Sequence, residues 1–456
     1  MHRIKKISTI LFVTLLFIAC KTNDSAYQPT NADKAHPDWV YDATIYEVNV
    51  RQYTPEGTFN AFQEHLPRLK ELGVDVLWFM PVQTIGEKDR KGTLGSYYSI
   101  QDYTEVNSEF GTMSDFKSIV DAAHNSGMKV ILDWVANHTS RDAIWLENED
   151  WYVTDSLGNV VAPYDWSDVA KLNYNNETIR NAMIQSMMWW VRNTDIDGFR
   201  CDVAHEVPTD FWLRATDSLK SLKSDIFMLA ESETPELNNK AFDAYYAWDF
   251  HHKMNMVAQG SGNEDSWRIA QNTMTSQFAD RAIPMYFTSN HDENSWNGTE
   301  FERMGDAATT FAVLTYVLPG MPLIYNGQEV GFNRRLEFFE KDSIDWFASE
   351  DRDKFTKLYQ QLNTLKKTNP ALFTQERGGE MVEIQNDFSE KVWSFKRVMG
   401  ENEVHCVFNF TDEDIVVDLE TPISGEGFIQ FPNEAASKPI ESIELKAWEY
   451  QLFYKN

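Results

Sequence analysis

The stretch Gly198-Phe-Arg-Cys-Asp202 decides which fold the sequence predicts. It is short and mostly apolar, as a strand buried on both faces is, and it ends in an acidic residue. Three other apolar runs end in the same way, at Asp133, Glu231 and Asp292. In a closed barrel of parallel strands the functional groups lie at the carboxyl ends of the strands. Each carboxylate alone fits a helix cap about as well, but four together favour one converging polar site.

Short apolar runs alternate with amphipathic stretches from about residue 40 onward. Apolar strands separated by helices predict a parallel sheet that is covered on both sides. The predicted strands lie in residues 44–50, 74–80, 130–134, 198–203, 226–230, 284–288 and 322–325, with a weaker one in 242–248. About eight such units predict an α/β fold, a closed (β/α)8 TIM barrel. The alternative is a doubly wound open sheet, which normally carries a glycine-rich phosphate loop that residues 54–57 do not provide.

The remaining chain suggests two further segments, one within and one after this barrel, which is predicted to occupy residues 37–371. Residues 139–172 are rich in Trp and Asp, lack a helical period, and are predicted to form a small insertion after the third strand. Beyond residue 371 alternating runs replace the helical period, so residues 372–456 are predicted to form a C-terminal antiparallel β-sandwich. Its clearest strands are expected in 391–398, 403–410, 415–419 and 448–454.

Residues 1–20 have the organisation of an export signal, with a basic start and an apolar run at 10–18 that is too short to span a membrane. The run ends in Ala and Cys20, which resembles the lipobox of bacterial lipoproteins, although Phe17 stands where Leu is usual. Ordinary signal cleavage nearby is the alternative. The polar residues 21–36 are predicted to be a flexible tether. We therefore expect an exported protein of the bacterial envelope, anchored by a lipid on Cys20.

The charge of the chain argues against one class of partner. Its formal net charge is −29, and no Lys/Arg cluster follows the N-terminal segment. Such a field repels nucleic-acid backbones and anionic membranes. Nucleic acid is therefore not expected as a partner, and membrane contact is expected only through the lipid anchor. Fifteen Trp and eighteen Tyr supply rings of the kind that stack on sugars, which gives weak support for a carbohydrate ligand.

Four motifs carry a more specific resemblance. They are Asp133-Trp-Val-Ala-Asn-His138, Gly198-Phe-Arg-Cys-Asp-Val-Ala-His205, Leu229-Ala-Glu231 and Ser289-Asn-His-Asp292. In this order, each at a predicted strand end, they resemble the four sequence regions of glycoside hydrolase family 13, the α-amylase superfamily. The resemblance covers about residues 40–456. It implies a (β/α)8 barrel with an insertion and a C-terminal sandwich.

The resemblance implies a retaining hydrolase of α-glucosidic bonds, mainly α-1,4, in starch and maltooligosaccharides. Asp202 would be the nucleophile, Glu231 the acid/base, and Asp292 the carboxylate that binds sugar hydroxyls and stabilises the distorted ring. Retention requires one ionised and one protonated carboxyl about 5–5.5 Å apart. Arg200, two residues before Asp202 on the same strand face, is expected to keep that carboxyl ionised. Glu231 is expected to have the raised pKa, because it must donate a proton near neutral pH.

Further residues are implied as ligands of the sugar. His138 and His291 are expected to be neutral hydrogen-bond donors to the bound ring, and Tyr98 its stacking platform. His205 is expected to contact the leaving-group side, where many α-amylases have Lys. Because Glu206 follows it in place of their His, contacts on that side should differ from the usual amylase pattern.

A structural calcium is also implied, with Asn137 as a candidate ligand, although Lys171 and Glu206 stand where relatives offer oxygen ligands. A hydrogen-bonding role that supports the loop is the alternative for Asn137. No cofactor is expected to be required for the chemistry. Asp133 is expected to orient neighbouring loops, and Glu329, after the last strand, to be a solvated loop residue.

Several functions share this chemistry and stay open. The chain could be an α-glucosidase, a cyclomaltodextrinase or neopullulanase-like enzyme, or a transglycosylase, which differ in how loops shape the leaving-group side. The motif Val169-Ala-Lys-Leu-Asn173 is similar to the neopullulanase-like variant. A reading of another class is a catalytically inactive barrel that binds glycans. Such chains usually lose carboxylates from the site, whereas this chain keeps all three.

Overall fold

The computed structural model of the chain describes residues 36–456 except 263–265, 424–426, 433 and 436–438. The predicted export signal, Cys20 and nearly all of the predicted tether lie outside the described residues. His36 was assigned to the tether but is buried, with its ring nitrogens 2.9 Å from Asp243 Oδ1 and 2.6 Å from the carbonyl oxygen of Arg281. These contacts place His36 in the folded body. In the described part of the chain, every helix is too short or too polar to cross a membrane.

Eight parallel strands of the described chain close into a barrel. In chain order they are β1 (Ile45–Val48), β2 (Val76–Phe79), β5 (Lys129–Trp134), β8 (Gly198–Cys201), β9 (Phe227–Ala230), β10 (Ala244–Tyr246), β11 (Ile283–Tyr286) and β12 (Met321–Tyr325). The barrel closes because β1 pairs with β2 on one side and with β12 on the other. The predicted TIM barrel is confirmed, including the weak strand, which is β10.

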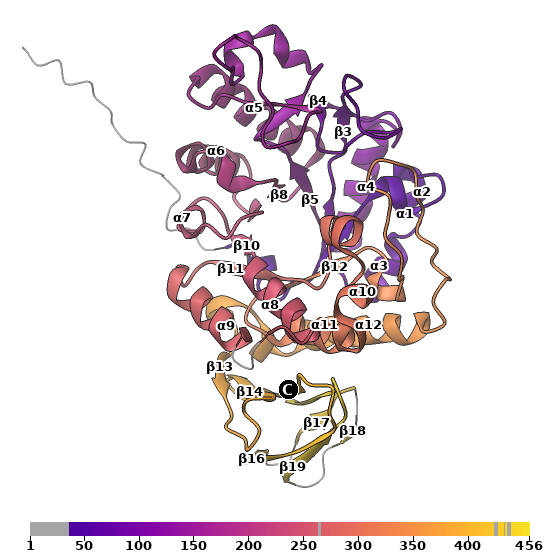
Figure 1. The fold of residues 1–456 in the computed structure, drawn as a ribbon, viewed down its shortest axis with the longest axis vertical. Helices are drawn as coiled ribbons and strands as arrows, with labels where there is room; N and C mark the ends of the chain where they lie inside the picture. The colour runs from indigo at the N-terminus through magenta and orange to yellow at the C-terminus, as the bar shows by residue number, and fades with distance from the viewer. Residues whose placement is uncertain (1–35, 263–265, 424–426, 433, 436–438) are drawn as a thin grey trace, which may run out of the picture.

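Helices surround the barrel strands (Figure 1). They are α1 (Val50–Tyr53), α2 (Phe59–Gln63), α3 (Leu66–Leu72), α4 (Met113–Asn125), α5 (Glu177–Thr194), α6 (Thr209–Leu222), α7 (Pro235–Asn238), α8 (Trp248–Ala258), α9 (Ser266–Gln277), α10 (Glu300–Met304), α11 (Ala308–Val317) and α12 (Arg352–Thr368). One apolar cluster fills the barrel interior and includes Trp78 and Tyr246. The barrel is therefore a packed core rather than a pore, and a ligand can bind only at its ends.

Two excursions rise from the C-terminal ends of the strands, at the upper end of Figure 1. In the first, β3 (Gln83–Ile85) pairs with β4 (Ile100–Val106), and residues 86–99 connect them. In the second, β6 (His138–Ser140) pairs with β7 (Val169–Lys171), which closes the base of the insertion. The sequence predicted the second excursion and missed the first.

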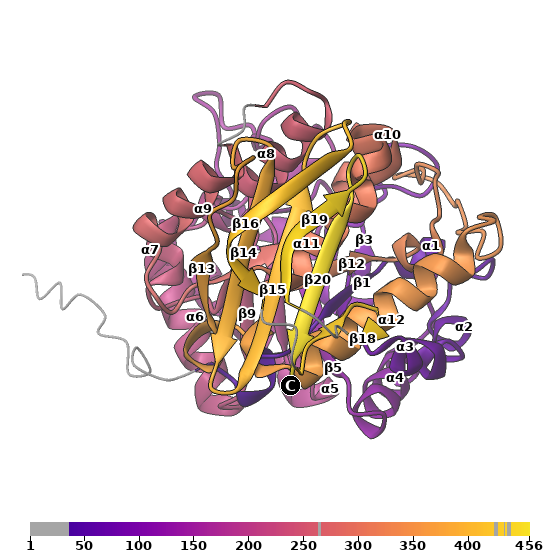
Figure 2. The same ribbon diagram turned by 90° about the horizontal axis from the view of Figure 1, so that it is seen from below.

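The C-terminal part forms antiparallel sheets, as predicted (Figure 2). One sheet contains β13 (Glu380–Glu383), β14 (Val392–Met399), β15 (Asn402–Asn409), β20 (Tyr450–Lys455), β17 (Ile429–Gln430) and β18 (Glu434–Ala435). The other pairs β16 (Ile415–Ile423) with β19 (Ile440–Leu445). Val407 and Phe453 of the first sheet and Val417 and Leu445 of the second belong to one buried cluster. These sheets lie at the opposite end of the molecule from the insertion, beyond α9, α11 and α12 (Figure 1).

Candidate active site

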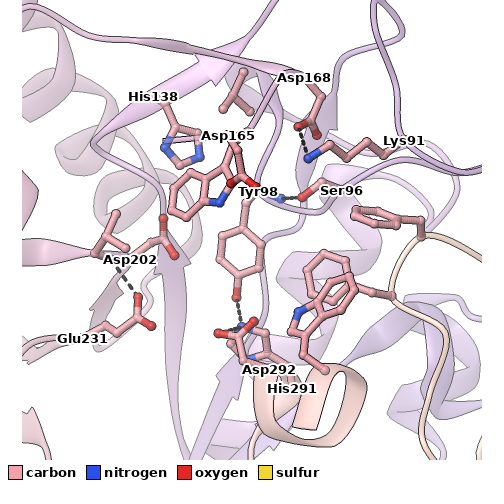
Figure 3. Close-up of a pocket in the computed structure, with 16 residues that line it drawn as sticks. Lys91, Ser96, Tyr98, His138, Asp165, Asp168, Asp202, Glu231, His291 and Asp292 are labelled. Carbon is pink, nitrogen blue, oxygen red and sulfur yellow. Dashed lines mark hydrogen bonds and ion pairs between the residues drawn. The ribbon is translucent and has the colours of Figure 1, made fainter. Parts of the chain in front are cut away.

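A cavity of about 660 Å³ opens at the C-terminal ends of the barrel strands (Figure 3). This end is called the mouth below, and the opposite end the base. The cavity is lined by Lys91, Ser96, Tyr98, His138, Asp165, Trp166, Asp168, Val169, Asp202, Val203, Glu231, His291, Asp292, Trp296, Phe338 and Phe339. A volume of this size is typical of small-molecule sites. It contains all three predicted catalytic carboxylates and three of the predicted sugar ligands.

Strand register brings Asp202 and Glu231 together. Cys201 in β8 is level with Ala230 in β9, and each is the last residue of its strand. The next residue in each chain segment is the carboxylate, so both side chains emerge at the same height of the barrel. Only 11% of the Asp202 side chain and 12% of the Glu231 side chain are exposed. The pair can therefore meet a ligand at the bottom of the cavity.

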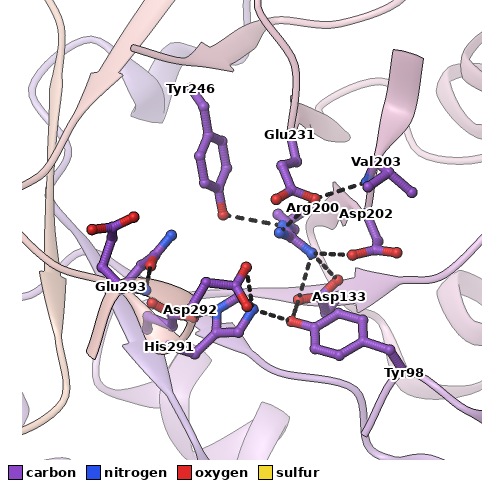
Figure 4. A network of polar contacts seen from close by, with 12 residues as sticks. Tyr98, Asp133, Arg200, Asp202, Val203, Glu231, Tyr246, His291, Asp292 and Glu293 are labelled. Atoms are coloured by element: carbon purple, nitrogen blue, oxygen red, sulfur yellow. Dashed lines mark hydrogen bonds and ion pairs between the residues drawn. The ribbon is translucent and has the colours of Figure 1, made fainter. Parts of the chain in front are cut away.

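Arg200 lies beneath the cavity and joins the carboxylates (Figure 4). Its Nη1 donates to Asp133 Oδ1 at 2.9 Å and to Asp202 Oδ1 at 3.2 Å, and its Nη2 lies 2.9 Å from Glu231 Oε2. Its Nε donates to the hydroxyl of Tyr246 at 3.1 Å. The whole guanidinium is buried. Arg200 therefore orients the pair from below and does not line the cavity.

Burial dominates the acidity of the two carboxyls. It raises the pKa of Asp202 well above its usual range, the nearby charge of Glu231 raises it further, and Arg200 acts in the opposite direction. Burial likewise raises the pKa of Glu231, again against the effect of Arg200. The raised pKa expected for Glu231 is thus found. Arg200 therefore lowers the pKa of Asp202 as expected but does not outweigh burial, and this one guanidinium is shared among three carboxylates including Asp133.

The two predicted histidines differ in charge. Burial lowers the pKa of His138 to about 3, so its ring is neutral, as expected. Burial acts to lower the pKa of His291 too, but the charges of Asp292 and Glu47 raise it to about 9. The prediction of a neutral His291 is therefore wrong: Glu47, buried in β1, lies 2.5 Å from Nδ1 of the ring. On the other side, Nε2 of His291 lies 2.7 Å from the Tyr98 hydroxyl.

Tyr98 is held in place by the same network. Its hydroxyl donates to Asp133 Oδ2 at 3.0 Å, and its ring stacks on that of His291 with centroids 5.4 Å apart. Its other neighbour is Phe338, at 6.3 Å. Asp133 itself is fully buried and accepts from Trp78 Nε1 at 3.2 Å. Asp133 therefore positions Arg200 and Tyr98 and is shielded from any ligand.

Val203 has a backbone conformation that a β-branched residue rarely adopts. Its φ is 36° and its ψ is 50°, in the left-handed region. Such a conformation costs about 1–3 kcal/mol and persists where the surroundings require it. Here it directs the Val203 N–H to Glu231 Oε2 at 2.8 Å. This hydrogen bond from the strained residue fixes Oε2 of the Glu231 carboxyl and leaves Oε1 available to a ligand.

Two predicted ligands lie elsewhere. The His205 side chain is 44% exposed and is not among the residues that line the cavity. Asn137 is buried, and its amide nitrogen lies 3.4 Å from Nδ1 of the neighbouring His138. Lys171 lies opposite His138 in the β6–β7 pair and binds Glu206 with Nζ 3.0 Å from Oε2. An ammonium in this position does not fit a calcium ion bound by Asn137 and its neighbours.

Glu329 is a correction to the sequence analysis. It was expected to be solvated, but its side chain is fully buried and accepts from the Tyr46 hydroxyl at 2.6 Å and from Arg68 Nη1 at 2.9 Å. The loop folds inward because the backbone turns at Gly327, whose φ is 102°. Glu329 therefore ties the last barrel strand to β1 and α3.

Other site residues were missed by the sequence analysis. Glu47 could have been found, because it is a single carboxylate inside the apolar run Ile45-Tyr-Glu-Val48. Lys91, Asp168, Phe338 and Phe339 lie in loops, and Trp296 lies in the short π-helix Glu293–Asn297; these segments carry no periodic signal.

A (β/α)8 barrel with a strand-end carboxylate pair, a third carboxylate and aromatic walls at its mouth has the features of a glycosidase. Comparison with known proteins agrees. The family model of the α-amylase catalytic domain matches residues 24–169 and 147–379. The chain therefore belongs to the α-amylase family, glycoside hydrolase family 13.

Individual relatives are similar along most of the chain. An α-amylase from Haloarcula japonica is 27% identical over 412 residues, which are 86% of this chain and 59% of that protein. The chain thus spans about three fifths of the length of this relative. The crystal structure of a noncanonic maltogenic α-amylase from Thermotoga neapolitana has 29% identity and a TM-score of 0.79, over 91% of this chain and 96% of that one. An α-amylase structure from Lactobacillus plantarum has 28% identity and a TM-score of 0.80, over 91% and 99%.

Proposed function

We propose that this chain hydrolyses α-glucosidic bonds, mainly α-1,4, of maltooligosaccharides and starch with retention of configuration. One observation carries the proposal. Asp202 and Glu231 are bound to the same buried guanidinium and both line one cavity, opposite Asp292. The names of the relatives, an α-amylase and a maltogenic α-amylase, support an α-glucan as substrate.

The first step forms a covalent intermediate. A carboxylate oxygen of Asp202 attacks the anomeric carbon, and Glu231 gives its proton to the glycosidic oxygen, so the leaving sugar departs as a neutral alcohol. The reactive state has a single proton on the pair, on Glu231. The Val203 N–H and Arg200 hold Glu231 Oε2, which leaves Oε1 to carry that proton toward the substrate.

The second step releases the sugar. The ionised Glu231 takes a proton from water, and the hydroxyl oxygen attacks the anomeric carbon and breaks its bond to Asp202. Asp292 accepts hydrogen bonds from hydroxyls of the same ring. The cationic His291, held by Glu47, pairs with Asp292, with Nε2 3.3 Å from Oδ2.

The test is turnover by the full chain with maltoheptaose, soluble starch and β-cyclodextrin, with products separated by length and their anomeric configuration followed by NMR. α-Anomeric maltooligosaccharides that disappear in Asp202→Asn support the proposal. β-Anomers as first products would overturn retention. Faster opening of β-cyclodextrin than of starch would assign the chain to ring-opening enzymes instead. A well-folded wild type that binds but never cleaves any α-glucan would favour the glycan-binding reading.

We also propose export and lipid anchoring through Cys20, supported by the basic start and apolar run before it. The full-length chain expressed in a bacterial host with radiolabelled palmitate should incorporate the label. Cys20→Ala should abolish the label and release the protein from the membrane fraction. A wild type without label would contradict anchoring.

A further inference from the structure

An ion pair lines the cavity on the side away from the catalytic pair. Lys91 Nζ lies 3.2 Å from Asp168 Oδ1, and both residues line the cavity. Figure 3 shows them on the far side of Tyr98 from Asp202 and Glu231. The Asp168 side chain is only 5% exposed, whereas that of Lys91 is 35% exposed. The pair therefore lies at the edge of the cavity, with its carboxylate inside the protein.

Lys91 belongs to the connection 86–99, which is fastened to the insertion. The Glu87 N–H donates to Asp142 Oδ2 at 2.9 Å, and the Ser99 hydroxyl donates to the Asp168 carbonyl at 3.1 Å. The Lys91–Asp168 pair is thus the cavity-facing contact of a longer seam between the two excursions. The seam therefore fastens the connection to the insertion on both sides of Lys91.

The same connection is fastened to the loop after β12. The Leu94 N–H donates to the Phe339 carbonyl at 3.0 Å, and the Thr93 N–H donates to Glu340 Oε1 at 2.8 Å. The two backbones approach closely at Gly92, whose φ is 61°. A Cβ there would lie 2.5 Å from Phe339 Cβ. Insertion, connection and loop therefore form one continuous wall.

We infer that the Lys91–Asp168 pair ends the glycone side of the cavity, so that the enzyme removes short products from the non-reducing ends of α-glucans. The inference rests on the proposed function, because the acid Glu231 defines the leaving-group side. The attacked ring lies among Asp202, Asp292 and Tyr98. Sugars that precede it in the chain must extend toward the wall. A chain with further sugars on that side would have to pass through the ion pair.

The wall also offers polar and aromatic groups to a terminal sugar. Lys91 and Asp168 can hydrogen-bond the hydroxyls that an internal glucose would use for its next glycosidic bond. Trp296, 51% exposed, packs with Phe338 with ring centroids 5.2 Å apart and also lines the cavity. A non-reducing end is thus matched by charge and stacking, and an internal segment is excluded by shape.

The experiment uses the full chain and two maltoheptaosides that carry the same chromophore at the reducing end. One has a free non-reducing end, and in the other O4 and O6 of that end are blocked by an ethylidene acetal. The measured quantities are kcat/KM for each substrate and the length of the unlabelled product. Lys91→Ala and Lys91→Met both remove the ion pair from the wall, and Asp168→Asn tests the partner. Lys88→Ala, an exposed lysine of the same connection, is the matched control.

We expect the wild type and Lys88→Ala to cleave the blocked substrate at least about tenfold more slowly than the free one, with one short unlabelled product. The Lys91 variants should reduce the ratio of kcat/KM for the free substrate to kcat/KM for the blocked substrate about tenfold. They should also release longer unlabelled products. Equal rates on both substrates in the wild type would overturn the inference, and so would an unchanged ratio in both Lys91 variants with unchanged thermal unfolding. Failure to cleave either substrate would instead overturn the proposed function.

Discussion

The barrel buries carboxylates at both of its ends, and the two sets have opposite acidities. At the base, Asp197 immediately precedes β8 and Asp243 immediately precedes β10. At the mouth, Asp202 and Glu231 immediately follow β8 and β9. All four lie in a similar environment of apolar strands, so burial alone does not distinguish them.

Each base carboxylate has two cations near it, Lys129 and Lys223 for Asp197 and Lys220 and Arg281 for Asp243. Asp197 binds Lys129 and Lys223 at 3.0 Å and the His124 ring at 2.7 Å. Burial acts to raise the pKa of Asp197, but the hydrogen bond from His124 and the charge of Lys223 hold it well below its usual range. Asp243 binds Lys220 at 3.1 Å and His36 at 2.9 Å, and these two partners likewise hold its pKa well below the usual range despite burial.

At the mouth the ratio of cations to carboxylates is reversed, because Asp133, Asp202 and Glu231 share the single cation Arg200. The comparison teaches that the number of cations for each carboxylate decides whether a strand end stabilises the fold or stays reactive. The base should be needed for stability and the mouth for turnover.

The largest effect is expected for Asp202→Asn. Loss of the nucleophile should lower kcat/KM for maltoheptaose about 10,000-fold or more. The thermal unfolding midpoint should not fall, because the removed charge was poorly compensated. A variant that loses activity only in proportion to its loss of folded protein would contradict the comparison.

Next is Glu231→Gln, which should lower kcat about 100- to 10,000-fold with a natural leaving group. The pH profile sharpens the result. Wild-type kcat/KM should fall as pH rises through the pKa of Glu231, which burial places above its usual range. Because the Glu231 charge raises the pKa of Asp202, the acid limb of the residual activity should move to lower pH in the variant. A limb that stays in place would mean that the carboxyls do not interact.

At the base, Asp243→Asn should leave the Lys220 ammonium buried without its partner. The free energy of unfolding should fall by about 3–5 kcal/mol, measured by urea denaturation, while kcat of the folded fraction is unchanged. Asp195→Asn is the control, since Asp195 pairs with Lys223 but its side chain is 71% exposed. Asp195→Asn should lower the free energy of unfolding by less than about 1 kcal/mol. Similar losses in both variants would remove the proposed difference between buried and exposed pairs.

The smallest effect concerns stability and pH. The raised pKa of Asp202 means that the folded state binds its proton more tightly than the unfolded state, so this stability is lost as pH rises. Asp202→Asn should therefore be more stable than wild type by about 1 kcal/mol at pH 7, with no difference below the usual aspartate range. Asp243 has the opposite sign: its contribution is present at neutral pH and is lost in acid. If the free energy of unfolding had the same pH dependence in wild type and Asp202→Asn, the raised pKa of Asp202 would be contradicted.

The sequence predicted the barrel because strands buried on both faces are apolar throughout, and that pattern is visible without a structure. It missed the β3–β4 pair because Gln101-Asp-Tyr-Thr-Glu105 is polar and lies above the barrel. Strand-end position was enough to predict Asp202, Glu231 and Asp292 as neighbours. The charge of His291 could not be predicted, because it depends on a carboxylate from β1.

The positions of loop residues were predicted wrongly in some cases and not predicted at all in others. Glu329 was expected in solvent and is buried, because a turn at Gly327 decides its place. Lys91 and Asp168 gave no signal, since their pairing depends on how two excursions lean together. His205 belongs to a matching motif yet does not line the cavity, so motif membership did not establish contact with the site.

The pairing of β1 with β12 has a consequence for biosynthesis. Glu47 and His291 meet across 244 positions of the sequence, and β12 must be in place before the strand that carries Glu47 is enclosed on both sides. A nascent chain that ends after Asp292 already carries the three proposed catalytic carboxylates Asp202, Glu231 and Asp292, yet its barrel is still open. The ribosome therefore has to deliver at least residue 325 before a growing chain can acquire activity, and truncation products should be inert toward the glucans of the cell that makes them.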